Sequence, residues 1–362
     1  MVRTSLVAGA LVVVAVAGCR TAPDPTVPLA DVAARAAHTA TRLDDGRVLV
    51  AGGCVTDGCT TASRDTFVVA ADGRSAVAGP AMAAPRDNHT AVALPDGRVV
   101  VAGGFTGEGA PVSGRVDVLD PAGGRIAAAP SLHQPRGGHA AALLPGGRVL
   151  VVGGWIAPQT STASAEVIDA RRGTVQPAAD LPWAADALDA VRLADGRVLV
   201  TGGRTAAGGT TAAAMFDPAT GRWTRVGPMA TPRFKHTSVL LADGRVLVIG
   251  GTTDDRRILD STEVFDPRTG RFSPGPALRT PRYKLPGGAA VLGDGRVLVG
   301  GGAMTVEVLD VDRATSSPVP TPRPSGSFAT VTALRGDRYL VLGGYDDRIR
   351  LRRQVAVLAP PG

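Results

Sequence analysis

The chain has 362 residues, of which 44% are hydrophobic, and it contains 47 glycines and 28 prolines. This hydrophobic content excludes a disordered chain, and the glycines and prolines favour many short strands joined by tight turns. The formal net charge is +7, but the arginines are scattered through nearly every turn. Such scatter argues against nucleic-acid binding.

The first 18 residues have the pattern of an export signal. Arg3 gives a short positive region, and the apolar run from Leu6 to Ala17 is too short to span a bilayer. The run ends in Val-Ala-Gly-Cys, which resembles a bacterial lipobox. The resemblance implies that Cys19 is acylated after cleavage and that residues 19–23 tether a lipoprotein to the cell envelope, outside the cytoplasm. The alternative is an ordinary secretory signal that contains a cysteine.

The other two cysteines, Cys54 and Cys59, lie in one loop. In an exported protein the expected state is a small loop-closing disulfide. Two free thiols are the alternative. A metal site is not expected, because the loop between them has no histidine and no second cysteine pair exists. We expect no cofactor either.

One nine-residue stretch recurs along the chain. Asp243–Gly251 reads DGRVLVIGG, and it is one of seven related copies whose successive Gly-Gly pairs lie 42 to 51 residues apart. The Asp-Gly turn supplies positive φ, the Val-Leu-Val run is typical of a buried strand, and the Gly-Gly pair lets neighbouring backbones approach closely. A period near fifty predicts a repeat architecture. The other copies begin at Asp45, Asp96, Gly146, Asp195, Asp294 and Gly336.

Each copy has the same flanks. A Pro-Arg-x-x-His entry and an apolar run precede the turn, as in Pro135–Leu144, and a strand ending in Asp-Pro follows, as in Glu263–Pro267. A further turn leads to a strand that opens on Trp223 or Phe272. Four antiparallel strands per unit predict one twisted blade.

This unit resembles the kelch motif, and its sequence is similar to that of the kelch repeats of bacterial galactose-oxidase-like propellers. The resemblance covers residues 24–362 and implies an all-β, seven-bladed β-propeller of four-stranded antiparallel blades. The seventh unit lacks a fourth strand, and Pro25–Leu29 has a strand-like pattern. We therefore predict that this N-terminal strand completes the last blade and closes the ring, which removes open strand edges.

The Pro-Arg arginines are candidate binding residues. By the kelch resemblance they lie on the face around the channel, where guanidinium groups of related adaptor domains bind acidic side chains. The alternative is that each arginine bridges blades internally. The fourth unit has Pro182-Trp183, and Asp186 where the histidine is expected, so that Trp183 is either a stacking platform or a decayed motif. The arginines are Arg35, Arg86, Arg136, Arg233, Arg282 and Arg323.

Three aromatic residues directly follow a Gly-Gly pair, namely Phe105, Trp155 and Tyr345. The loops that they begin vary most between copies, and variable loops on a rigid scaffold are where recognition usually lies. They suit peptide or glycan binding, or alternatively cap the ends of the blades. The acidic pairs Asp254-Asp255 and Asp346-Asp347 are interpreted as solvated turns rather than cation sites.

The motif histidines are interpreted as structural, because equivalent residues of different blades lie too far apart to share a metal. They are His38, His89, His139 and His236, and His133 lies outside the motif and is expected to be exposed. The copper radical chemistry of galactose oxidase needs a tyrosine cross-linked to cysteine, and the few tyrosines and cysteines here do not match it.

The sequence thus predicts a monomeric, non-catalytic extracytoplasmic propeller that binds a protein or glycan partner through its loop face. The alternative is a carbohydrate-active enzyme, by resemblance to periplasmic kelch-type sugar mutarotases. Convergent Glu, His and Arg side chains in the channel would favour the enzyme. Aromatic and cationic side chains around its mouth would favour the binding protein.

Overall fold

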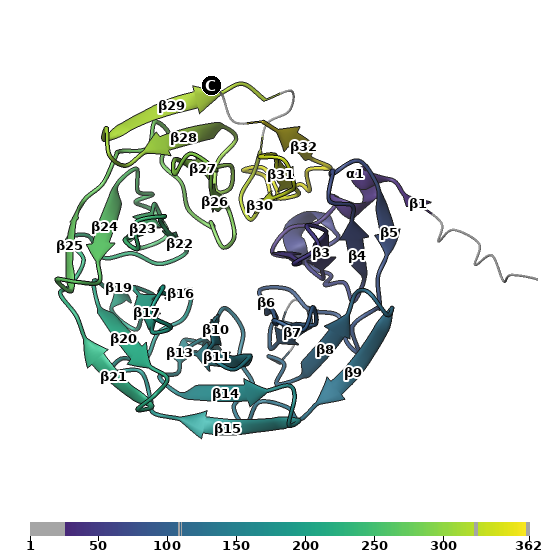
Figure 1. The fold of residues 1–362 in the computed structure, drawn as a ribbon, viewed down its shortest axis with the longest axis horizontal. Coiled ribbons are helices and arrows are strands. Elements are labelled where there is room, and N and C mark those ends of the chain that lie inside the picture. Colours follow the sequence, from purple (N-terminus) through teal and green to yellow (C-terminus); the bar gives the residue numbers. More distant parts are fainter. Residues whose placement is uncertain (1–25, 108, 110, 322–324, 360–362) are drawn as a thin grey trace, which may run out of the picture.

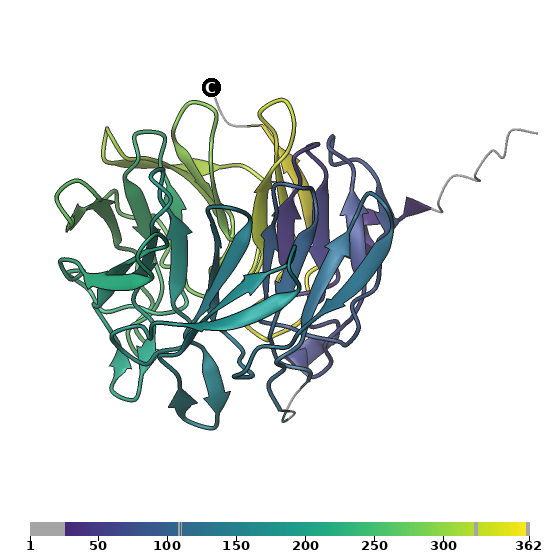
Figure 2. The same cartoon turned by 60° about the horizontal axis from the view of Figure 1, so that its bottom comes forward.

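The computed structural model describes residues 26–359, apart from positions 108, 110 and 322–324. Seven small antiparallel sheets stand around a central channel, as Figure 1 shows, and Figure 2 shows the ring tilted toward its side. The prediction of an all-β, seven-bladed propeller is confirmed. The predicted export signal, Cys19 and the tether lie outside the described residues.

Apart from β1 in the first blade, the strands of each blade follow the chain from the channel outward (Figure 1). Five blades have four strands, each paired antiparallel with the next. Their bounds are β6 (Thr90–Ala93), β7 (Val99–Ala102), β8 (Val116–Asp120) and β9 (Arg125–Ala129); β10 (Ala140–Leu144), β11 (Arg148–Val152), β14 (Ala165–Asp169) and β15 (Thr174–Ala178); β16 (Asp189–Arg192), β17 (Val198–Thr201), β20 (Ala213–Asp217) and β21 (Arg222–Arg225); β22 (Thr237–Leu240), β23 (Val246–Ile249), β24 (Thr262–Asp266) and β25 (Arg271–Pro274); and β26 (Ala289–Val291), β27 (Val297–Val299), β28 (Val306–Asp310) and β29 (Thr315–Val319).

The first and last blades differ from these five. The first has five strands in the order β1-β5-β4-β3-β2, and the last has three, β30-β31-β32. Two short hairpins, β12–β13 and β18–β19, stand after the Gly-Gly pairs of the third and fourth blades. The bounds are β1 (Thr26–Val27), β2 (Thr39–Arg42), β3 (Val48–Ala51), β4 (Thr66–Val69), β5 (Ala76–Ala78), β30 (Thr330–Ala333), β31 (Tyr339–Leu342), β32 (Val355–Leu358), β12 (Trp155–Ala157), β13 (Thr160–Ser161), β18 (Arg204–Thr205), β19 (Gly208–Gly209), the helical turn α1 (Leu29–Val32) and the 3-10 turn η1 (Asp57–Cys59).

The hydrophobic core lies between blades. Seven buried clusters correspond to the seven seams between neighbouring blades. The Val-Leu-Val strands are buried along their whole length, as in β23, because each is covered on both faces by an adjacent blade. The predicted buried strand is therefore confirmed.

The Gly-Gly pairs make the predicted close approach. A Cβ atom added to Gly250 would lie 2.6 Å from the carbonyl oxygen of Arg282 in the next blade, and Gly250 has a φ of +59°. The amide of Gly251 donates to the same oxygen at 2.8 Å. A side chain at Gly250 would separate the two blades.

The predicted closure by an N-terminal strand is wrong. β1 pairs with β5 of the first blade, and the last blade has three strands among the described residues. Pro28 begins α1 directly after β1, which turns the chain into the seam between the last and first blades. There Val32 packs with Leu334 and Leu340. Packing in this seam and contact between β2 and β30 close the ring.

Cys54 and Cys59 are joined by a disulfide in the structure. Their Cα atoms lie 5.0 Å apart, within the range that disulfides span. Cys54 is buried and pairs with Ala36 and Ala62 through β-bridges, so the disulfide ties the first post-Gly-Gly loop to the blade. No helix among the described residues is long and apolar enough to cross a membrane.

Candidate functional site at the mouth of the channel

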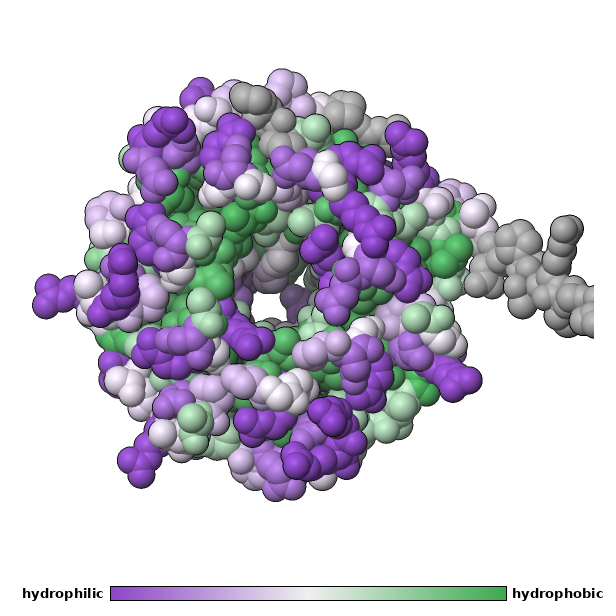
Figure 3. All heavy atoms as spheres, viewed as in Figure 1, coloured by the Kyte–Doolittle hydropathy of each residue, from purple (hydrophilic) through white to green (hydrophobic). Residues whose placement is uncertain are grey.

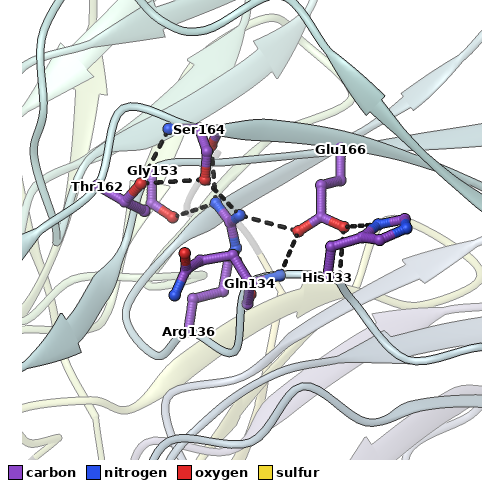
Figure 4. A network of polar contacts seen from close by, with 7 residues as sticks. All are labelled: His133, Gln134, Arg136, Gly153, Thr162, Ser164 and Glu166. Carbon is purple, nitrogen blue, oxygen red and sulfur yellow. Dashed lines mark hydrogen bonds and ion pairs between the residues drawn. The ribbon is translucent and has the colours of Figure 1, made fainter.

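The Pro-Arg arginines lie inside the blades. Arg136 is fully buried and donates to the carbonyl oxygens of Gly153 (2.8 Å) and Ser164 (2.7 Å) and to Glu166 Oε1 (2.9 Å), as Figure 4 shows. The second oxygen of Glu166 accepts from the backbone amide of His133 at 2.7 Å. Burial lowers the pKa of Arg136, which the adjacent Glu166 carboxylate opposes. The ion pair holds the entry loop onto its own blade.

The same arrangement recurs around the ring. Ion pairs of 2.7–2.8 Å join Arg86 to Asp117, Arg233 to Glu263 and Arg282 to Glu307. These six side chains are buried or nearly so, and each arginine also donates to the first glycine of a Gly-Gly pair. This corrects the prediction that they form a surface for a partner, because these arginine side chains are fully buried and form their ion pairs inside the blades.

Arg35 is the variant in the first blade. Its guanidinium donates to Gly52 O at 2.7 Å and stacks 4.7 Å from the ring of Phe67, which takes the place of the carboxylate. Burial lowers its pKa to about 10, with Asp65 acting in the opposite direction. It too is a structural residue. Arg323 lies outside the described residues.

Trp183 is also structural, and the predicted alignment of its unit is off by two residues. The amide of Gly154 donates to Ala185 O, whereas the amide of Gly104 donates to Arg136 O, so Ala185 holds the backbone position of the arginine. Trp183, two residues earlier, is half-buried, packs against the core and donates from its indole to Gly202 O at 3.1 Å. The guanidinium of Arg225 lies over its ring, 5.8 Å from the centroid, so the protein itself already stacks on this indole.

The motif histidines bridge neighbouring blades, as predicted for a structural role. His89 Nε2 lies 3.1 Å from Thr39 Oγ1, and His139 Nε2 lies 2.8 Å from Thr90 Oγ1. Burial, together with the nearby positive charge of Arg136, lowers the pKa of His139 to about 3. The imidazole is therefore neutral near pH 7. His133 is exposed, as expected.

Seven residues with positive φ encircle the mouth of the channel, one per blade, each directly before the position of the motif histidine. Their φ angles lie between 46° and 58°. Several are linked from blade to blade: the amide of Asn88 donates to Ala37 O at 3.0 Å, and the amide of Lys235 donates to Ala187 O at 2.9 Å. We call them the mouth residues, and they are Ala37, Asn88, Gly138, Ala187, Lys235, Lys284 and Phe328.

The mouth residues surround a cavity of about 660 Å³. This volume lies within the range of small-molecule sites, about 300–1,000 Å³. In Figure 3 an opening is visible at the centre of the ring. Three cationic side chains reach the cavity wall from neighbouring blades, namely Arg204, Lys235 and Lys284. Sequence reasoning missed all three, although Lys235 and Lys284 are the only lysines of the chain.

Aromatic rings also line or support the cavity wall. Phe105 and Trp155 line the cavity with their ring centroids 5.3 Å apart. On another side Phe328 meets the buried Tyr345 edge-on at 5.7 Å. Two of the predicted aromatic residues thus reach the cavity, and Tyr345 supports its wall through Phe328.

The carboxylates near the mouth are partly neutralised. Asp186 pairs with Arg204 at 3.0 Å, and Asp255 forms an ion pair with Lys235. Burial lowers the pKa of Lys235, and the Asp255 carboxylate opposes that effect. Asp189 lines the cavity at the start of β16, where its Oδ2 accepts from the amide of Ser238 at 2.5 Å.

Asp189 is a carboxylic acid of the channel wall with a shifted pKa. Burial raises its pKa to about 7, although hydrogen bonds from Ala190 and Ser238 act in the opposite direction. Its side chain is partly accessible because it faces the channel. Five other blades place threonine or alanine at this strand position, as at Thr90 and Ala140.

The acidic pairs are turn residues. Asp254 Oδ1 accepts from the amides of Arg256 and Arg257, and Asp346 Oδ1 accepts from those of Arg348 and Arg350. Over the part of the chain that the structure describes, no three His, Cys, Asp or Glu side chains are grouped as a metal site would require.

The fold is a seven-bladed propeller, and most blades contain the same buried ion pair. Comparison with known families indicates the type of repeat. Residues 233–279 match the model of the Kelch motif. Together these findings support a kelch-repeat β-propeller.

A solved structure titled "Structure of YjhT" is similar in fold. Its TM-score is 0.61 at 13% sequence identity, and the match covers 93% of this chain and 97% of that chain. At this identity the likeness extends to the fold. The search of curated proteins found no match.

Proposed function

We propose that the protein is a non-catalytic binding propeller that recognises a protein or glycan partner at the mouth of its channel. The observation that carries this proposal is the separation of two sets of polar groups. The carboxylates of Glu166, Glu263 and Glu307 are paired inside the blades, whereas Lys235 and Lys284 stand beside aromatic rings at the cavity. Aromatic and cationic side chains at one rim are typical of recognition surfaces.

The test is binding of the full-length protein to arrays of glycans and of peptides. We expect hits that are lost in Trp155→Ala, which removes an aromatic wall of the mouth. The matched control is Arg313→Ala in the exposed β28–β29 turn, which should leave the hits unchanged. Equal thermal stability of the two variants would separate loss of the site from loss of the fold. Hits unaffected by Trp155→Ala, or no hits at all, would contradict the proposal.

One observation favours a second function, a carbohydrate-active enzyme such as a sugar mutarotase. Asp189 has a pKa raised to about 7 and lines the same cavity, as a general acid–base group would. The test is exchange NMR of the α and β anomers of reducing sugars with the protein present. Acceleration that Asp189→Asn abolishes would support the enzyme. A rate of anomer exchange that the protein does not change would contradict the mutarotase and leave binding as the proposed function.

We further propose that the protein is held in the cell envelope by acylation of Cys19, facing outside the cytoplasm. The support is the sequence pattern before Cys19. Metabolic labelling with palmitate should mark the intact protein and not Cys19→Ser. The variant should also leave the membrane fraction. Equal labelling of both proteins would exclude acylation at Cys19.

A further inference from the structure

The two lysines are an unusual feature of this chain. It contains 37 arginines and only Lys235 and Lys284 as lysines, and both are mouth residues of adjacent blades. Everywhere else the chain uses guanidinium as its cation. An ammonium is a compact charge with three donors, whereas a guanidinium is a flat, wider fork. The placement therefore indicates a ligand held by a point charge inside the cavity.

Two of the three cations around the cavity form ion pairs with carboxylates. Lys235 forms an ion pair with Asp255, and Arg204 pairs with Asp186 at 3.0 Å. Lys284 has no carboxylate within ion-pair distance among the described residues. Of the three cations at the mouth, Lys284 is thus the one whose charge the protein leaves uncompensated.

Aromatic rings hold Lys284 in place of a carboxylate. Its Nζ lies 4.8 Å from the ring centroid of Tyr283, 5.0 Å from that of Tyr345 and 6.0 Å from that of Phe328. Burial acts to lower the pKa of Lys284, but interactions with the hydroxyls of Tyr345 and Tyr283 outweigh it and raise the pKa. The ammonium therefore remains charged although it is partly removed from water, which strengthens its attraction for an anion.

We propose that the cavity binds a small organic monocarboxylate, whose carboxylate contacts Lys284 and whose flat face packs against Phe328. One uncompensated positive charge matches one carboxylate, and a doubly charged phosphate would exceed it. The volume of about 660 Å³ admits a single sugar ring or an amino-acid-sized molecule. This inference rests on the proposed binding function and names the chemistry that its site selects.

The scarcity of lysine allows a direct test. Reductive methylation with ¹³C-formaldehyde keeps the charge and gives each lysine of the full-length protein its own NMR signal. Lys235→Arg and Lys284→Arg assign the two signals. The probes are matched pairs: glucuronate against glucose, and N-acetylphenylalanine against its amide. The first pair tests a sugar acid and the second a peptide carboxylate.

We expect the acid of at least one pair to shift the Lys284 signal saturably and to bind about tenfold more tightly than its neutral partner. In Lys284→Met this preference should disappear, whereas Lys235→Arg should retain it. Melting temperatures equal to that of the wild type show that the variants are folded. Equal binding of acid and neutral partner, a preference that persists in Lys284→Met, or no shift with either acid would overturn the inference. Array hits lost in Trp155→Ala would still support the binding propeller in that case.

Discussion

The indole of Trp183 donates a hydrogen bond of 3.1 Å to the carbonyl oxygen of Gly202. In five other blades a buried guanidinium donates to the equivalent glycine, as Arg136 does to Gly153. Where Trp183 replaces the guanidinium, Ala214 occupies the strand position of Glu166. The fourth blade has thus lost both partners of the buried ion pair together, as expected if either charge alone would be left unpaired in the interior.

This relationship predicts how the third blade responds to substitution. Arg136→Met should destabilise the protein by about 3–5 kcal/mol, because Glu166 then loses its buried counter-charge. Arg136→Met combined with Glu166→Ala should be more stable than Arg136→Met alone. Urea denaturation of the single and double variants measures the coupling. Arg172→Ala, which removes an exposed ion pair with Asp169, is the control and should change little. Additive losses would contradict the explanation.

The raised pKa of Asp189 predicts that the folded state loses stability as the pH rises. Its folded pKa of about 7 lies above the unfolded value of about 3.9, so the folded state binds the proton more tightly. The contribution of Asp189 to stability is therefore full below pH 4 and is lost as pH rises through 7. Asp189→Asn keeps an oxygen acceptor for Ser238 and removes the titration.

Urea denaturation at pH 4, 6 and 8 measures this effect. The stability of Asp189→Asn relative to the wild type should increase between pH 4 and 8, by at most about 4 kcal/mol. Access of channel water to the carboxyl should reduce that figure. A stability difference that is constant from pH 4 to pH 8 would show that the folded pKa of Asp189 is not raised.

The lowered pKa of His139 predicts the opposite trend, a loss of stability as the pH falls. Its folded pKa of about 3 lies below the unfolded value of about 6.5, so its contribution is full above pH 6.5 and is lost as pH falls toward 3. His139→Gln removes the titration and keeps a polar side chain near Thr90. His139→Leu copies Leu188 of the fourth blade, which packs against Gly153 as His139 packs against Gly103. When the pH is lowered from 7 to 4, the melting temperature of both variants should fall less than that of the wild type. An unchanged slope would contradict this.

The closure of the ring predicts which N-terminal residues matter. Of the described residues, removal of residues 1–27 takes away only the two-residue outer strand β1, and it should change the melting temperature little. Val32→Ala should cost about 2 kcal/mol, because Val32 is fully buried in the seam between the last and first blades. Thermal unfolding compares the two variants. A large decrease in the melting temperature on deletion, with no decrease in Val32→Ala, would instead support closure of the ring by the N-terminal strand.

The repeat itself determined the architecture. Asp-Gly turns, Val-Leu-Val strands and Gly-Gly pairs are local patterns, and each predicts its own conformation without knowledge of the rest of the chain. Seven copies with one period then leave little choice beyond a ring of blades. The structural role of His89 and His139 also followed, because equivalent residues of a ring are kept apart.

Only the tertiary structure decided what the side chains face. The sequence pattern places Arg136 in an entry loop, but its burial depends on Glu166, thirty residues later on another strand. The register of Trp183 depends on the hydrogen bond between Gly154 and Ala185. Lys235 and Lys284 become neighbours of one cavity only when the ring closes, because the mouth is assembled from one residue of each blade. A site built from seven distant segments has no local signal in the sequence.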